Sequence, residues 1–165
     1  MKKIIALMLA LLMMASLTAC GGNAATPAED VRPVESSYSF MFWDVELEMG
    51  APFDPGMLPE ETVVEKVPSH TMVGTDNVYN YEVIELTTFN DGTGEVIYSL
   101  CMLDPNTPTT EGLHLGDSLE QLEALYGTDY TANGTELVFR KGNALLICIV
   151  EDEVIISIEY RMVTE

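Results

Sequence analysis

Basic residues are scarce in this chain. Its 165 residues include 7 Lys and Arg against 27 Asp and Glu, which gives a net charge of −20 at pH 7. A domain with this charge repels phosphate backbones and gains nothing from anionic lipid headgroups. We therefore expect no nucleic acid among its partners. The charge is typical of a soluble surface protein, and it leaves divalent cations or a basic protein open as partners.

Cysteine and histidine are also rare, with 3 and 2 residues respectively. The chain has no Asp-x-Asp-x-Asp-Gly loop of the kind that binds calcium, and we predict neither a metal nor a cofactor. Cys101 and Cys148 lie in the apolar runs "VIYSLCML" and "NALLICIVED", and neither run supplies a base. We expect buried thiols, although a disulfide between the two would also be permitted if the chain lies outside the cytoplasm.

No apolar run is long enough to span a membrane. The longest, residues 4–17, has about 14 residues, whereas a spanning helix needs about 20. Lys2 and Lys3 precede this run, and Leu-Thr-Ala-Cys, ending at Cys20, follows it. The pattern resembles a bacterial lipoprotein signal, which implies that residues 1–19 are removed and Cys20 is lipidated. The alternative is an ordinary secretory signal with an incidental Cys.

The resemblance implies a chain that is anchored on the outer face of the cell membrane without spanning it. The mature chain would carry a net charge of about −22, because its signal contains two lysines and no acid. Residues 20–36, "CGGNAATPAEDVRPVES", are small and polar and contain proline, so we interpret them as the lipidated Cys and a flexible tether. Residues 37–165 then suit a single domain.

The C-terminal half predicts a helix followed by three strands. Asp117 or Ser118 caps a helix whose apolar residues are Leu119, Leu122 and Leu125, and Gly127 ends it. The strands "TELVFR", "ALLICIV" and "VIISIEYRMV" follow, separated by turns short enough for antiparallel hairpins.

The N-terminal half repeats this pattern loosely. Residues 47–50 correspond to 113–116, and "EVIYSLCML" (95–103) corresponds to "EVIISIEYR" (153–161). Prolines 52, 55 and 59 leave room for only about one helical turn in the first copy. We predict an α+β fold: two degenerate helix-plus-meander repeats, about 42–104 and 110–163, that form one antiparallel sheet with its helices on one face.

Residues 116–119, Gly-Asp-Ser-Leu, match the tetrapeptide after which one hydrolase superfamily is named. A nucleophilic Ser118 would need a His base, an orienting acid and an oxyanion hole. The only histidines are His70 and His114, and none follows Ser118. Asp117-x-x-Glu120 and Ser118-x-x-Gln121 instead fit a capping box. We therefore predict a structural role for Asp117 and Ser118 and no catalytic residue.

The stretch "TEGLHLGDSLEQLEALYG", with the meander that ends in "SIEY", resembles a group of uncharacterised lipoproteins from clostridial and related low-GC bacteria. The resemblance spans most of residues 42–162. Members often carry Pro-Ser-Cys where this chain has Pro68-Ser69-His70. More distantly, the repeat is similar to the β-lactamase inhibitory protein and to small outer-membrane assembly lipoproteins, which implies a non-enzymatic protein that acts by protein–protein contact.

Several other side chains are candidates for binding. We interpret Trp43 as a residue of the core or of first-strand packing and His70 as a solvated loop residue. A tyrosine-rich binding face is the remaining candidate, and its members are Tyr79, Tyr81, Tyr126 and Tyr130. A pair of catalytic carboxylates cannot be selected from 27 acidic residues by sequence.

Together these patterns predict a lipid-anchored, extracytoplasmic, non-enzymatic protein that binds a protein, a peptide or another envelope component. The alternatives are an envelope hydrolase that uses Ser118 and a sensor lipoprotein that binds a small ligand or a cation.

Overall fold

The computed structural model describes residues 37–58 and 63–164, which belong to one compact unit. The predicted signal peptide, the lipidated Cys20 and the tether lie outside these residues. The strands are β1 (Ser39–Phe42), β2 (Val45–Glu48), β3 (Val63–Pro68), β4 (Thr75–Asn80), β5 (Ile84–Asn90), β6 (Glu95–Met102), β7 (Thr131–Asn133), β8 (Glu136–Lys141), β9 (Ala144–Glu151) and β10 (Val154–Met162). The helices are a 3-10 turn, η1 (Pro55–Met57), and α1 (Leu119–Tyr126).

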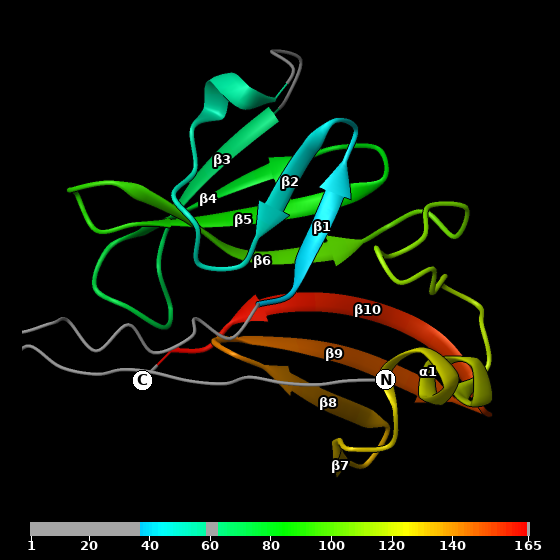
Figure 1. Cartoon of the computed structure of the whole chain (residues 1–165). Helices are drawn as coiled ribbons and strands as arrows, with labels where there is room; N and C mark the ends of the chain where they lie inside the picture. Colours follow the sequence, from blue (N-terminus) through cyan, green and yellow to red (C-terminus); the bar gives the residue numbers. More distant parts are fainter. Residues whose placement is uncertain (1–36, 59–62, 165) are drawn as a thin grey trace, which may run out of the picture. The chain divides into compact units, whose positions relative to one another are not determined.

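Eight of the strands form one antiparallel sheet in the order β3-β4-β5-β6-β10-β9-β8-β7. The strands β3 to β6 make one meander, β7 to β10 make a second, and the two meet at β6 and β10 (Figure 1). β1 and β2 form a separate hairpin. The three strands predicted in the C-terminal half are present as β8, β9 and β10.

The predicted α+β fold class with two helical repeats is wrong. The described residues are mostly β-structure, and α1 is the single α-helix among them. Pro52 and Pro55 prevent a helix in the first half, because proline lacks an N–H group and clashes with the preceding turn. Only η1 forms there, with the Asp54 side chain accepting a hydrogen bond from the N–H of Gly56.

A short segment nevertheless pairs with the last strand of each meander in the same way. In the first half, the N–H of Gly50 donates to the carbonyl of Ile97 in β6 at 2.8 Å. In the second half, the N–H of Gly116 donates to the carbonyl of Ile155 in β10 at 2.8 Å. The alignment of the two halves of the sequence places Gly50 opposite Gly116 and Ile97 opposite Ile155. We call residues 50–53 and 116–119 the inserted segments.

Two further hydrogen bonds hold each inserted segment. The first segment accepts from the N–H of Ile97 and donates from Phe53 to the carbonyl of Glu95. The second accepts from the N–H of Ile155 and donates from Leu119 to the carbonyl of Glu153. Because β5 and β9 occupy the other edges of β6 and β10, the segments lie along the edges that face the sheet centre. β6 and β10 consequently pair over only three residues each, with Tyr160 opposite Leu100 in the middle of the pairing.

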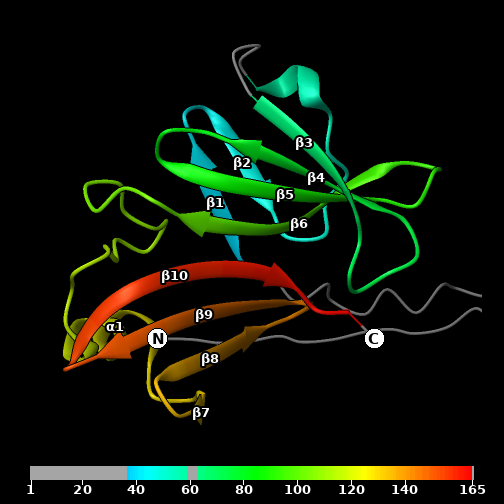
Figure 2. The ribbon, with the colours of Figure 1, turned by 180° about the vertical axis from the view of Figure 1, so that it is seen from behind.

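The β1–β2 hairpin and α1 cover the same face of the sheet, which we call the inner face. Figure 1 shows the hairpin crossing in front of β5 and β6, and Figure 2 shows it behind them. Tyr38 links the parts of this layer, since its ring lies 6.2 Å from that of Tyr126 in α1 and 5.7 Å from that of Tyr160 in β10. Phe40, Leu47 and other buried side chains complete one core. Within the described residues, no helix is long and apolar enough to cross a membrane.

The loop before β4 approaches the sheet closely at Gly74. A Cβ there would overlap the carbonyl oxygen of Asn90 and lie 2.7 Å from the ring of Phe89. We expect Gly74→Ala to lower the free energy of unfolding by about 1–3 kcal/mol in urea denaturation. Gly94→Ala is the matched control, because a Cβ at Gly94 meets no atom within 4 Å. An equal loss in both variants would contradict the predicted close approach.

Candidate functional site

Strand β9 carries large apolar side chains on both of its faces. Leu146 and Cys148 point to the inner face and are fully buried in the core. Leu145, Ile147 and Ile149 alternate with them and therefore point to the opposite, outer face. A strand that needs only one apolar face normally alternates with polar residues, whereas an apolar run of this kind is typical of strands that are covered on both sides.

The outer face consists of side chains from the middle strands of the sheet. In Figure 2 no described helix or strand lies in front of this face. Register places Leu145 and Ile147 beside Arg140 and Val138 of β8. The remaining members of the outer face, taken from the strand registers, are Glu85, Thr87, Ser99, Cys101, Glu136, Ile149, Ser157, Glu159 and Arg161.

An ion pair lies at the centre of the outer face. Nε and Nη2 of Arg161 donate to the two carboxylate oxygens of Glu159, each at 2.7 Å. These hydrogen bonds raise the pKa of Arg161, and Tyr98 and Glu136 add to the effect. Because Arg161 is held in a fixed plane and its side chain is 42% exposed, it offers an ordered surface at low cost in conformational entropy.

Cys101 and Cys148 lie on opposite faces of the sheet and are both free thiols. β10 separates their strands, so the disulfide that the sequence left open does not form. Burial, together with Glu159 and Glu85, raises the pKa of Cys101 to about 11. Burial raises the pKa of Cys148 to about 12. Both thiols are therefore protonated near neutral pH and are weak nucleophiles.

Ser118 occupies the N-cap position of α1. Its backbone is extended, with φ −80° and ψ 158°, and its Oγ accepts a hydrogen bond from the N–H of Gln121 at 3.2 Å. Asp117 has a different role, since its Oδ2 accepts from the N–H of His114 at 2.8 Å and lies 3.6 Å from His114 Nδ1. The Ser118 hydroxyl is thus used by the helix terminus.

The four candidate tyrosines do not gather on one exposed face. Tyr79 is buried in the core and donates to Glu95 at 2.8 Å, and Tyr81 is half-buried against Phe42. Both belong to the first half of the domain.

Tyr126 and Tyr130 lie in the second half, and both hydroxyls have partners. Tyr126 donates to Glu111 at 2.6 Å and lies 3.2 Å from the hydroxyl of Tyr160. Tyr130 donates to Glu123 at 2.8 Å, and its ring packs on Phe139. These contacts are structural, because each phenol stabilises the helix–sheet layer rather than facing a free surface.

Trp43 is not a core residue, but it does pack on the first strand. Trp43 lies in the turn between β1 and β2, is 64% exposed and stacks on Phe42 with ring centroids 4.8 Å apart. Its φ of +53° is strained for a bulky residue. His70 is an exposed loop residue after β3. In the part of the chain that the structure describes, no three His, Cys, Asp or Glu side chains form a group suited to a metal ion.

The outer face was not among the candidates taken from the sequence. The signal for it is the run "ALLICIV" of β9, which breaks the apolar–polar alternation of a strand with one solvent-exposed face. Comparison of the chain with models of protein families, with curated proteins and with solved structures finds no match.

The capping role of Ser118 predicts an effect on stability. We expect Ser118→Ala to lower the free energy of unfolding by about 1 kcal/mol, measured in urea, because the N–H of Gln121 loses its acceptor. Ser118→Asp should retain most of the stability, since a carboxylate also caps a helix. A hydrolase would behave differently: Ser118→Ala would abolish an activity and leave the melting temperature unchanged.

The buried phenols predict loss of stability at alkaline pH. Burial, followed by Glu111 and Cys148, raises the pKa of Tyr38 from 10.0 to about 12, and burial also raises the pKa values of Tyr126 and Tyr160. The folded state therefore holds these protons more tightly than the unfolded state. Their contribution is complete below pH 10 and is lost as the pH rises towards 12.

The measurement is the melting temperature between pH 8 and pH 12 together with tyrosinate absorbance. We expect the absorbance of the buried phenols to rise only as the protein unfolds. Tyr126→Phe should be less stable at neutral pH, because it loses the hydrogen bond to Glu111, and less sensitive to pH above 10. A melting temperature that stays constant from pH 10 to pH 12 would refute this assignment.

Proposed function

We propose that the protein is a lipid-anchored, extracytoplasmic and non-enzymatic module that binds another protein through the outer face of its sheet. The observation that carries the binding proposal is the apolar outer side of β9, where Leu145 and Ile149 are half-buried and Ile147 is buried. Burial of such side chains contributes about 25 cal/mol per Å² of apolar area. The signal-like N-terminus, with Cys20 as the attachment site, supports the lipid anchor and the location.

The composition of the outer face favours a protein partner over a small molecule. It is an extended sheet surface that combines aliphatic side chains with Arg161, and arginine is enriched among the residues that dominate protein interfaces. The ion pair with Glu159 holds the guanidinium in place before a partner arrives.

Charge complementarity indicates the chemistry of the partner. The chain has a net charge of −20, and Glu85 and Glu136 lie on the outer face itself. The partner surface should therefore have an aliphatic centre with Lys or Arg around it. Attraction between such surfaces accelerates association and weakens as salt is added.

The test is capture from a detergent extract of the envelope of the cells that produce the protein, with the full-length chain immobilised. Leu145→Asp and Ile149→Asp each place a carboxylate in the proposed interface. We expect each to weaken capture by about tenfold or more, because the partner would bury an unpaired charge. Val73→Asp is the matched control, since Val73 is 97% exposed in the loop before β4.

The result that supports the proposal is a single protein that the wild type and Val73→Asp retain and both β9 variants lose. Melting temperatures of all four forms establish that the loss is not caused by unfolding. The proposal fails if no protein is enriched over an unrelated acidic domain, or if all four folded forms capture the same protein equally.

A further inference from the structure

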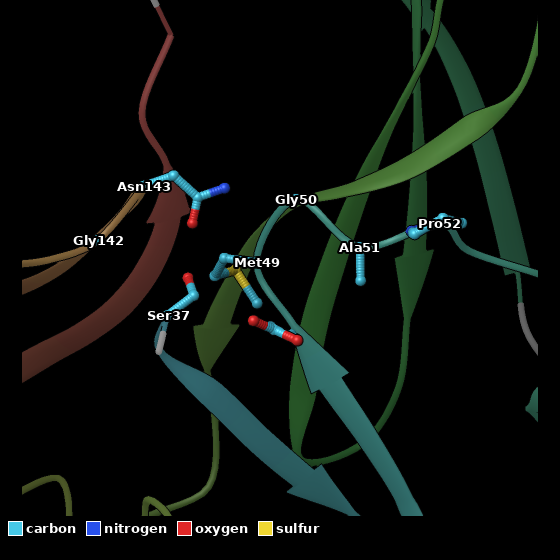
Figure 3. Close-up of a pocket in the computed structure, with 8 residues that line it drawn as sticks. Ser37, Met49, Gly50, Ala51, Pro52, Gly142 and Asn143 are labelled. Carbon is cyan, nitrogen blue, oxygen red and sulfur yellow. The ribbon is translucent and has the colours of Figure 1, made fainter. Parts of the chain in front are cut away.

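A cavity of about 520 Å³ lies away from the outer face, beside the first inserted segment. It opens where the start of β1 and the end of β2 meet the turn between β8 and β9 (Figure 3). Met49, Ala51 and Pro52 give it an apolar wall, and Ser37, Glu48 and Asn143 supply its polar side chains. None of these six residues belongs to the outer face.

Ser37 is the most informative residue of this cavity. It is only 8% exposed, yet its Oγ has no hydrogen-bond partner among the described residues. A buried hydroxyl without a partner destabilises the fold, so such groups are normally satisfied. Figure 3 shows the Ser37 hydroxyl pointing toward the side chain of Asn143 across the cavity. This unused group indicates a place for a ligand atom.

The remaining polar groups define what that atom would be. In Figure 3 the oxygen of the Asn143 amide lies on the side of Ser37, and Nδ2 of the same amide lies against Gly50. Glu48 adds a carboxylate to the lining. The cavity thus offers a carboxylate oxygen, an amide oxygen and a hydroxyl oxygen, all of which accept hydrogen bonds.

We propose that this cavity binds the primary ammonium group of a small ligand. An ammonium group has three donors and no acceptor, which matches three acceptors, and its charge pairs with Glu48. The net charge of −20 attracts a cation to the cavity from solution. The apolar wall then contacts the carbon skeleton of the ligand. This site is independent of the proposed protein-binding face.

Calorimetric titration of the full-length protein in detergent tests the proposal with three sources of the ammonium group: putrescine, lysine and glucosamine. N-acetylglucosamine is the neutral counterpart of the last. We expect saturable binding of at least one amine and none of N-acetylglucosamine. The amine that binds most tightly distinguishes between a polyamine, an amino acid and an amino sugar.

Variants locate the binding in the cavity. We expect Ser37→Ala and Glu48→Gln each to weaken binding of the preferred amine by about tenfold, the usual effect of losing one hydrogen bond to a charged group. Glu46→Gln is the matched control, because it removes the same charge two residues away, where Glu46 accepts a hydrogen bond from Ser39 outside the cavity.

Retention of tight binding by Glu46→Gln would support the site. Absence of binding by all three amines would overturn the proposal. Equal weakening in Glu46→Gln and Glu48→Gln would also overturn it, because the amines would then be responding to the general acidity of the surface.

Discussion

The arrangement of the whole sheet depends on the backbone pairing of the two inserted segments. Residues 50–53 and 116–119 occupy the edges of β6 and β10 that would otherwise pair with each other. Only residues 99–101 and 159–161 remain to join the two meanders. Each segment begins with a glycine whose φ is positive, +85° at Gly50 and +92° at Gly116, a conformation that other residues adopt at a cost. The β1–β2 hairpin precedes the first inserted segment and α1 follows the second, and both lie on the inner face of the sheet. Within the described residues, the outer face is formed by the strands alone.

Sequence patterns predicted the second half of the domain better than the first. The Ser118 cap, the apolar spacing of α1 and the alternation of β8 and β10 all agree with one another, so local preference and tertiary structure coincide there. In the first half the prolines predict only about one helical turn, and η1 is that turn, so the error was to treat it as equivalent to α1 in a second helical repeat. The β1–β2 hairpin was missed because its turn, Trp43-Asp44, lacks the Gly or Asn that normally allows a positive φ. Packing of Phe40 and Phe42 in the core imposes this turn against the preference of Trp43.

The candidate site could be predicted only in part, and the tyrosines show the reason. A tyrosine in an amphipathic segment is equally suited to a binding surface and to a structural contact. The hydrogen-bond partner of its hydroxyl shows which role it has. Tyr79, Tyr126 and Tyr130 donate to Glu95, Glu111 and Glu123 respectively. In a chain with 27 acidic and 7 basic residues, tyrosine hydroxyls provide the donors that lysine and arginine usually provide. These partners are 7 to 16 residues away in sequence, and no sequence period connects them.

The apolar side chains on the outer side of β9 favour association with further copies of the same chain, and the acidic charge opposes it. Two copies that approach through their outer faces bring together two domains of high negative charge, which repel each other before apolar contact is made. The repulsion falls for a neutral partner and becomes attraction for a basic one. In the proposed interaction, charge would select among the partners that the apolar side chains of β9 could accept, since burial of apolar area alone does not distinguish them. The acidic composition and the apolar strand would thus act together: β9 would supply the affinity, and the carboxylates would restrict which proteins can use it.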